Sequence, residues 1–352
     1  MQYPPAFVTP AHDPQPHLLP GDRIGESPGR EIGSQPAGPG RFGRRQEDHQ
    51  GVQHQQTTRQ AFHGILLGNR LGRPSPSIKV RLTTGGGTAT IRAEMPPFID
   101  AHVHANNRSS EDFRRLAAAG CAGVVAVAGE EGGFSLPESV LDHFRRLARV
   151  DRPRLQAAGV KCWLALGVHP RGIPARQAEE LWPRLPAIWR ELVADAVGEV
   201  GLEDDSPAER RALLEQLRLA DQEKLPVIVH TPRRHKAMRL RTTLEILADS
   251  GIAPERVCLD HLDEDTLEPA ADSGCWLGLT VHPAKLSPAR VAGLVASRGG
   301  ARIIVSSDLG ANPSYLFGVP AAEQAMREMG LDEQDIRAAV HDNAAGFMDR
   351  PT

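Results

Sequence analysis

The sequence has little that would mark a secreted, disulfide-stabilised or membrane-spanning protein. It has only four cysteines in 352 residues, without a CxxC pair, and no apolar run approaches the roughly 18 residues of a membrane span. Its first residues also lack the basic start and apolar run of a secretory signal. We therefore expect a cytoplasmic protein without membrane contact. Its cysteines are expected to be buried free thiols in a reducing compartment: Cys121, Cys162, Cys258 and Cys275.

The chain also lacks a large excess of either charge, with a net charge of −3 at pH 7. Residues 1–94 contain 11 Lys and Arg against 7 Asp and Glu, whereas the remaining residues contain 30 against 37. The acidic balance of the second part argues against the broad basic surface with which proteins track duplex DNA. It leaves open a nuclease in which bound metal ions contact the phosphates.

Residues 1–94 lack the periodic apolar pattern of a folded domain. They contain 11 Pro and 14 Gly and show no sustained period of 2.0 or 3.6 residues. Such a segment cannot bury enough apolar surface to offset the entropy lost on ordering. It is predicted to be a disordered N-terminal extension, or else to precede the true start of translation at Met95, where the first well-patterned stretch opens.

Residues 95–352 alternate apolar strand-like runs with amphipathic helical patterns, which is typical of βα units around a parallel sheet. No GxGxxG follows an early run, so an open doubly wound sheet is the weaker alternative. A stretch of 258 residues is close to the roughly 250 of a (β/α)8 TIM barrel, which is the predicted fold. The eight runs are 98–104, 123–129, 160–170, 195–203, 226–231, 256–262, 275–282 and 302–308.

Two of the intervening helices carry recognisable start signals. Ser109 or Ser110 precedes the pattern EDFRRLAAAG, and Ser206 precedes PAERRALLEQLRLADQEK with Glu209 three residues later. A serine hydroxyl at this position accepts a hydrogen bond from a backbone N–H of the first turn, and a Glu three residues on completes a capping box. Both segments are therefore predicted to be helices.

Several runs end in side chains that bind metals. In the first run, the alternation of a strand places His102 and His104 on one face, so that both imidazoles can bind one ion. Glu199 lies inside the apolar fourth run, where a carboxylate is costly unless it is paired or metal-bound. In a (β/α)8 barrel the carboxyl ends of all the strands meet at one mouth. The other strand-end candidates are His230, His261 and Asp308.

These donors, imidazole nitrogens and carboxylate oxygens, suit Zn²⁺, Mn²⁺ or Mg²⁺. Six protein ligands are more than one catalytic zinc ion normally takes. We therefore predict two divalent ions about 3.5–4 Å apart, bridged by one carboxylate and a water. No lysine stands in place of Glu199 on the fourth strand, so a carbamylated lysine bridge is not expected.

The order of these motifs resembles the TatD family of the amidohydrolase superfamily of metal-dependent hydrolases. The resemblance extends from about Phe98 to Met348 and rests on IDAHVH (99–104), GVHP (167–170), GEVGL (198–202), SSD (306–308) and NAAGFM (343–348). It implies that His102, His104 and Asp308 bind the first ion, that His230 and His261 bind the second, and that Glu199 bridges the two.

The sequence departs from the family pattern at two places. Glu203 stands where the family usually has Asp, four residues after the bridging carboxylate. After His230 the chain reads Thr231-Pro232-Arg233-Arg234, which displaces the arginine that commonly follows the fifth-strand histidine. The displacement is expected to re-aim any contact of this arginine with a phosphate.

The resulting prediction is a binuclear metal-dependent hydrolase in which Asp308 orients the attacking water and takes its proton. The expected substrate is a small anion, such as a phosphoester or nucleotide-like compound. The alternatives are a 3'-end exonuclease on single-stranded DNA or RNA, a lactone or amide hydrolase, and a non-enzymatic metal-binding barrel. The sequence predicts no oligomeric state. The candidate substrate-binding residues are His169, Arg171, Arg233, His282 and Lys285, with Arg234 and Lys236 as weaker candidates.

Three other residues are assigned to the structure rather than to the chemistry. Trp163 and Trp276 lie within apolar runs and are predicted to be core residues. Asn343 is expected to support a loop rather than to contact substrate.

Overall fold

The computed structural model of the chain describes residues 96–129, 133–311 and 313–349. The predicted N-terminal extension, residues 1–94, lies outside the described residues, as does the proposed start at Met95. Within the described ranges, no helix is long and apolar enough to cross a membrane.

Eight parallel strands form the centre of the fold, and each falls within or beside one of the runs predicted from the sequence. Most of them are shorter than predicted, because the last polar residues of several runs lie in the loop that follows the strand. The strands are β1 (Phe98–Val103), β2 (Cys121–Val127), β3 (Lys161–Ala165), β4 (Val197–Gly201), β5 (Val227–His230), β6 (Val257–Leu262), β7 (Trp276–Thr280) and β8 (Ile303–Ser306).

The strands follow their sequence order around the sheet. Continuous ladders join β1 to β3 and β4 to β8, and isolated parallel bridges link the two ladders at both edges. One bridge pairs Ala165 with Ala196, and the other pairs Val103 with Leu309. The predicted (β/α)8 barrel is confirmed, because eight parallel strands in sequence order, with helices between them, are the defining arrangement of this fold.

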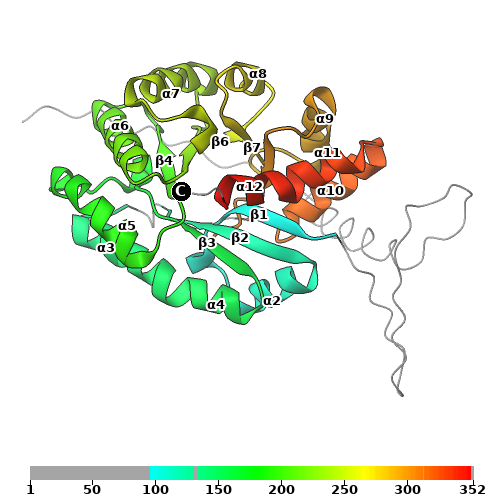
Figure 1. Cartoon of the computed structure of the whole chain (residues 1–352), viewed down its shortest axis with the longest axis horizontal. Helices are drawn as coiled ribbons and strands as arrows, with labels where there is room; N and C mark the ends of the chain where they lie inside the picture. The colour runs from blue at the N-terminus through cyan, green and yellow to red at the C-terminus, as the bar shows by residue number, and fades with distance from the viewer. Residues whose placement is uncertain (1–95, 130–132, 312, 350–352) are drawn as a thin grey trace, which may run out of the picture. The chain divides into compact units, whose positions relative to one another are not determined.

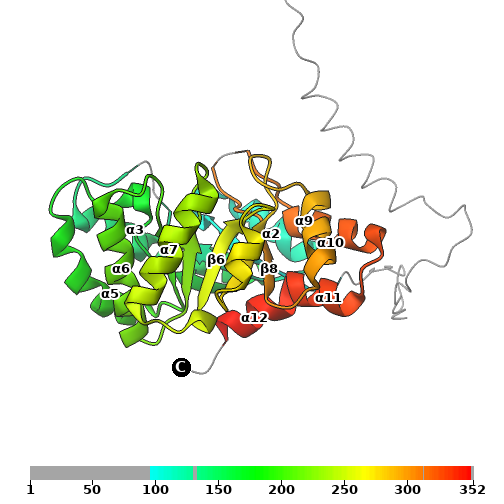
Figure 2. The same cartoon turned by 90° about the horizontal axis from the view of Figure 1, so that it is seen from above.

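Helices surround the strands, as Figure 1 shows for α2 through α10 and Figure 2 shows from another side. The α-helices are α2 (Ser110–Ala118), α3 (Pro137–Arg146), α4 (Arg152–Ala157), α5 (Leu185–Leu192), α6 (Pro207–Gln222), α7 (Lys236–Ser250), α8 (Leu267–Ala271), α9 (Pro288–Arg298), α10 (Gly318–Met329), α11 (Glu333–Arg337) and α12 (Asn343–Met348). Short 3-10 segments are η1 (Ala105–Asn107), η3 (Pro170–Gly172), η4 (Ala178–Glu180), η5 (Trp182–Arg184) and η6 (Pro254–Arg256), and π turns are η2 (Leu147–Asp151) and η7 (Ala338–Asp342).

The two predicted helix starts are confirmed. Ser109 caps α2, where its hydroxyl accepts from the N–H of Asp112 and the Asp112 side chain accepts from the N–H of Ser109. Ser206 caps α6, where its hydroxyl accepts from the N–H of Glu209. The carboxylate of Glu209, however, does not return to the N–H of Ser206 but binds the preceding turn.

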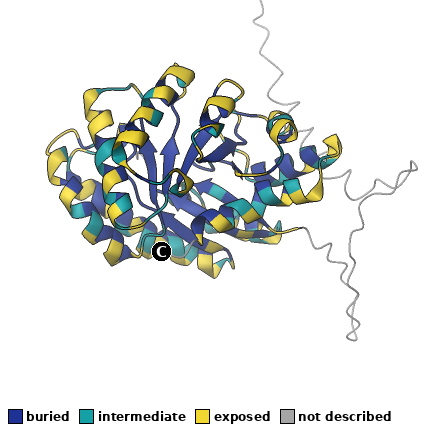
Figure 3. Ribbon diagram, turned by 45° about the horizontal axis from the view of Figure 1, so that its top comes forward, coloured by how far each residue is buried: buried dark blue, intermediate teal, exposed yellow. Residues whose placement is uncertain are grey.

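The core has two layers because strand side chains alternate between faces. Val124 belongs to the larger cluster, between the strands and the surrounding helices, whereas its neighbour Val125 belongs to a smaller cluster inside the barrel. Figure 3 shows the strands as a continuous buried region beneath helices with exposed outer faces. All four cysteines are buried and free, and Trp163 and Trp276 are core residues, as predicted.

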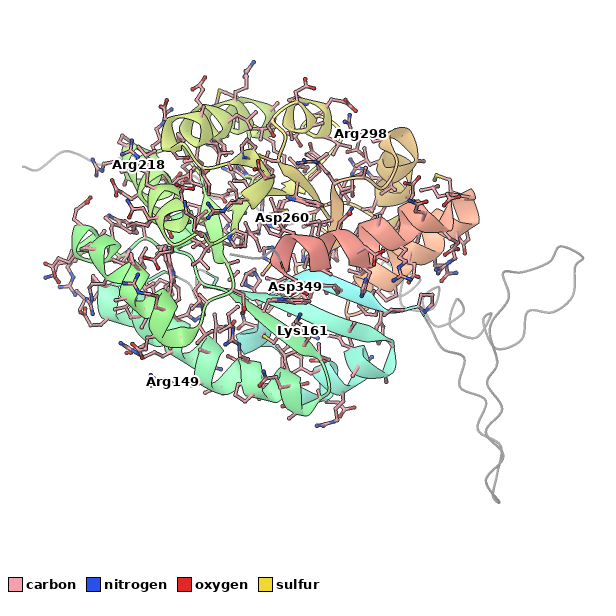
Figure 4. The ribbon with its side chains drawn as sticks, in the orientation of Figure 1. Arg149, Lys161, Arg218, Asp260, Arg298 and Asp349 are labelled. Carbon is pink, nitrogen blue, oxygen red and sulfur yellow. The ribbon has the colours of Figure 1, made fainter. Side chains whose placement is uncertain are left out.

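Helix α12 covers one end of the barrel, where Phe347 and Met348 pack against the smaller cluster (Figures 1 and 2). Nδ2 of Asn343 donates to the backbone oxygens of Gly300 (2.8 Å) and Ile303 (2.7 Å), so this side chain supports the loop before β8 as predicted. Beyond α12, Asp349 accepts from Nζ of Lys161 at 2.9 Å (Figure 4). This end of the barrel is therefore closed by packing and polar contacts.

Candidate metal centre

The six predicted metal ligands lie together because the barrel brings the carboxyl ends of its strands to one mouth. His102, Glu199, His230 and His261 belong to β1, β4, β5 and β6, and all four side chains are buried. His104 follows β1 by one residue, and Asp308 follows β8 by two. Residues separated by about 200 positions thus share one cluster.

Glu199 is the centre of the cluster, and its two carboxylate oxygens face different imidazoles. Oε2 lies 3.4 Å from Nε2 of His102 and 4.0 Å from Nε2 of His104. Oε1 lies 2.8 Å from Nδ1 of His230 and 2.9 Å from Nε2 of His261. One carboxylate therefore joins two groups of donor atoms.

Asp308 completes the first of these groups. Its Oδ1 lies 3.1 Å from Nε2 of His104 and 3.7 Å from Nε2 of His102, and the two imidazole nitrogens are 3.4 Å apart. Ligand atoms bound to one ion at roughly 2.0–2.2 Å are separated by similar distances in tetrahedral geometry. The residues present thus fit a divalent ion, both in the chemistry of the donors and in their spacing.

Asp260 orients part of this cluster, and it is not among the residues predicted from the sequence. Its Oδ2 lies 2.6 Å from Nδ1 of His102, and its Oδ1 accepts from the backbone N–H of His261 at 2.7 Å. A carboxylate behind a histidine fixes the ring so that the opposite nitrogen faces the metal position. The available signal was a carboxylate inside the otherwise apolar run VCLDHL. Figure 4 labels this residue near the centre of the barrel.

Glu203 has a similar role on the other side of the centre. Its Oε2 lies 2.9 Å from Nε2 of His230, whose Nδ1 faces Glu199. When Nε2 of His230 carries the proton and donates it to Glu203, Nδ1 keeps its lone pair for a metal ion. The glutamate that stands in place of the family aspartate therefore still reaches this histidine.

The charged groups of the cluster perturb one another strongly. Burial alone would raise the pKa of the Glu199 carboxyl, but His102 and His230 hold it well below its ordinary value. Burial disfavours a charged His102, yet Glu199 and Asp260 raise its pKa well above the usual range. The imidazole of His102 thus lies in a field of buried carboxylates that favours a positive charge, whether a proton or a metal ion.

Close approach and backbone strain accompany this arrangement. His261 and Asp308 have φ angles of 62° and 48°, in the left-handed region that most side chains avoid. A Cβ on Gly278 would lie 2.4 Å from Oδ1 of Asp260, and one on Gly129 would lie 2.9 Å from Nδ1 of His104. The absence of a side chain at Gly278 makes room for the Asp260 carboxylate, and its absence at Gly129 makes room for the imidazole of His104.

A cavity of about 310 Å³ opens above the centre, and all the predicted metal ligands except the fully buried His102 contribute to its lining. The lining also includes all five residues predicted to bind substrate: His169, Arg171, Arg233, His282 and Lys285. Arg234 and Lys236 are not among the lining residues. Nζ of Lys236 instead donates to the backbone oxygen of His261 and pairs with Asp263 at 3.1 Å.

Within the lining, the two loop histidines also shape their loops. Nδ1 of His169 accepts from the N–H of Arg171 at 3.1 Å, and Nδ1 of His282 accepts from the N–H of Ala284 at 3.1 Å. Burial lowers the pKa of both imidazoles below the ordinary value. At neutral pH these rings are therefore neutral groups that can exchange hydrogen bonds with a bound molecule.

Eight parallel strands with imidazole and carboxylate donors at one mouth define the class as a (β/α)8 barrel with a candidate metal centre. The family model described as TatD related DNase matches residues 99–346. The chain therefore belongs to the TatD family.

Individual relatives agree with this assignment. A protein of Methanocaldococcus jannaschii described as an uncharacterized metal-dependent hydrolase is 35% identical over 249 residues, which is 71% of this chain and 98% of the relative. A 3'-5' ssDNA/RNA exonuclease TatD of Cronobacter sakazakii is 33% identical over 124 residues, covering 34% of this chain and 46% of the relative. The crystal structure of a TatD-like protein from Archaeoglobus fulgidus superposes with a TM-score of 0.63 at 31% identity and covers 72% of this chain and all of that chain.

Proposed function

We propose that this chain hydrolyses a small phosphoester or nucleotide-like anion with two divalent ions, Zn²⁺, Mn²⁺ or Mg²⁺, at the barrel mouth. The main support for this proposal is that the two oxygens of the Glu199 carboxylate face two different groups of donor atoms. His102, His104 and Asp308 would hold one ion, His230 and His261 the other, and Glu199 would bridge them. This assignment accounts for all six buried or half-buried donors without leaving a charge unpaired.

When bound, the two ions would lower the pKa of a water between them and polarise the phosphoryl oxygen of the substrate. The side chain of Asp308 would orient this water and accept its proton as the water oxygen bonds to phosphorus. The bond from phosphorus to the leaving oxygen would break, and that oxygen would take up the proton that Asp308 received from the water. The products are a phosphate and an alcohol, so the reaction needs no further reactant.

The cavity supports a small anionic substrate. Arg171, Arg233 and Lys285 contribute cationic groups to its lining, and His169 and His282 contribute neutral imidazoles. Among the described residues that line the cavity there is no Phe, Tyr or Trp on which successive bases could stack. A ligand held by charge at its phosphate end therefore suits the cavity better than a long single strand held by stacking.

Exonuclease action on single-stranded DNA or RNA is the second candidate. It is favoured by the partial match to the Cronobacter sakazakii exonuclease and by cations at the mouth that could hold a terminal phosphate. Both candidates require the same metal centre, so they differ only in what lies beyond the scissile phosphate.

The first experiment measures the metal centre itself. The chelator-stripped chain should bind two equivalents of Mn²⁺ or Zn²⁺, and Glu199→Gln should lose affinity for both ions. Binding of fewer than two ions by the wild type would contradict the binuclear proposal.

The second experiment compares substrates. We expect the wild type to turn over mononucleotide esters faster than single-stranded oligonucleotides, and both faster than lactones, amides or long duplexes. Asp308→Asn should lower turnover by roughly 10² to 10⁴, the usual effect of losing a general base. Asp349→Asn, which removes a carboxylate at the closed end of the barrel, is the matched control. Faster cutting of oligonucleotides would favour the exonuclease, and activity independent of Asp308 would overturn the proposed site.

A further inference from the structure

The turn after β4 is held by a buried carboxylate that belongs to neither the cavity lining nor the metal cluster. Oε2 of Glu209, in the first turn of α6, accepts from the backbone N–H groups of Glu203 (2.9 Å), Asp204 (3.0 Å) and Asp205 (2.8 Å). The Glu209 side chain is buried, with 8% of the residue exposed. Three charge-assisted hydrogen bonds to one oxygen fix the path of the turn.

A second group binds the carbonyl groups of the same region, whereas Glu209 binds N–H groups. The guanidinium of Arg239, which is buried on α7, donates through Nη1 to the backbone oxygens of Glu203 and Arg234. Asp205 has a φ of 64°, so the turn contains a residue in the left-handed region. A strained conformation of this kind persists only where several contacts hold it in place. Here the hydrogen bonds of Glu209 and Arg239 to the turn provide those contacts.

The first residue of this turn contacts a candidate metal ligand. Glu203 accepts from Nε2 of His230 at 2.9 Å, and Nδ1 of His230 lies 2.8 Å from Oε1 of Glu199. A chain of contacts thus extends from Glu209 through the backbone of Glu203 to its side chain, and from there to His230. Its two hydrogen bonds, Glu209 to the Glu203 N–H and Glu203 to His230, are joined by the covalent bonds of Glu203 and lie between groups that are buried or half-buried.

We propose that Glu209 is a positioning residue for the second metal ion, acting through Glu203. By folding the 203–205 turn, it aims the Glu203 carboxylate at Nε2 of His230, which leaves Nδ1 of His230 to bind the metal. Loss of a partner that orients a metal ligand typically costs 10- to 100-fold in metal affinity. The inference rests on the proposed function, because it assumes that His230 binds an ion.

A purely structural role for Glu209 has a different consequence. Glu209 is also the third residue of α6, and its N–H donates to the capping hydroxyl of Ser206. If Glu209 served only to begin α6, any change that weakens this helix start would affect the metal centre equally. Ser206→Ala is therefore the matched control, because it removes the cap and leaves the Glu209 carboxylate on the turn.

The experiment titrates the full-length, chelator-stripped chain with Co²⁺ and follows visible absorption to obtain the affinity of each site. The near-isosteric Glu209→Gln places an amide group against the three N–H donors and should weaken the second site about 10-fold. Ser206→Ala should lower the thermal unfolding midpoint but leave both Co²⁺ affinities unchanged. Glu203→Gln should weaken the second site, and Glu203→Gln combined with Glu209→Gln should weaken it no further.

The outcomes separate this inference from the proposed function. A wild type that binds fewer than two Co²⁺ ions would overturn the function. Two tight sites in both wild type and Glu209→Gln would overturn only the role of Glu209. Additive losses in the double variant, or an equal loss in Ser206→Ala, would show that Glu209 does not act through Glu203. Circular dichroism of each variant establishes that it is folded before titration.

Discussion

Nζ of Lys285 lies 2.5 Å from Oδ2 of Asp308, while Oδ1 of the same carboxylate lies 3.1 Å from Nε2 of His104. The loop between β7 and α9 thus places a cation against a candidate metal ligand. Burial would raise the pKa of Asp308, but Lys285, His104 and His102 hold it well below the ordinary range. Lys285 is therefore positioned to keep the proposed general base ionised, in addition to its place in the cavity lining.

Replacing Lys285 by Met should lower kcat by roughly 10- to 100-fold, as expected when the partner of a metal-binding carboxylate is lost. The carboxylate of Asp308 would lose its fixed orientation while the six candidate metal-binding donors remain. Steady-state kinetics with the metal-loaded protein provides the measurement. Lys161→Met removes a lysine that pairs with Asp349 at the closed end and should leave kcat unchanged. An unaltered kcat in Lys285→Met would contradict the assigned role.

Replacing Asp260 by Asn should weaken metal binding by roughly 10- to 100-fold. The amide would still fill the space beside Gly278 but would no longer hold His102 as a charged acceptor at 2.6 Å. Metal content after dialysis against a graded series of chelator concentrations measures the effect. Asp265→Asn, at an exposed position in the loop after β6, is the control. Equal metal retention by both variants would count against an orienting role for Asp260.

Replacing Asn343 by Ala should lower the free energy of unfolding by roughly 1–3 kcal/mol, because the backbone oxygens of Gly300 and Ile303 lose their donor. The metal centre lies at the other end of the barrel, so metal affinity should stay the same. Urea unfolding and a Mn²⁺ titration of the same preparation test both statements. If Asn343→Ala is as stable as the wild type but binds metal more weakly, the structural role assigned to Asn343 is wrong.

A chain that begins at Met95 should fold and keep the full activity of the 352-residue chain. The eight strands and all six candidate ligands lie downstream of this residue. Thermal unfolding and turnover of a mononucleotide ester by the two chains are the measurements. If only the full-length chain is soluble and active, residues 1–94 contribute to the fold and the proposed division after residue 94 is incorrect.

The fold was predictable because its elements are local patterns. The eight apolar runs and the caps at Ser109 and Ser206 depend on neighbours within a few residues, and the structure has strands and helices at these places. The cluster of candidate ligands was also accessible from sequence. Once parallel strands are assumed, their carboxyl ends must meet at one mouth, whatever the exact register.

Contacts between distant loops were not accessible in this way. Nothing in the sequence pairs Lys285 with Asp308, or turns the Glu209 carboxylate from its own helix start toward the residues before it. Likewise, Lys236 follows β5, which made it a candidate for substrate binding, but its Nζ donates to the backbone oxygen of His261. The rotamer and loop path that decide each case depend on packing between elements far apart in the chain.

The sequence by itself determined the barrel, the family and the set of candidate donor residues, because periodicity and motif order record which side chains share a strand face or a strand end. Only the tertiary structure decided how those donors are divided. Glu199 presents one oxygen to His102 and the other to His230. This arrangement depends on side-chain torsions and strand register, which the alternation of residues along a single strand does not reveal. Asp260 and Glu203 acquire their roles in the same way, since an orienting carboxylate is defined by the ring nitrogen that it faces.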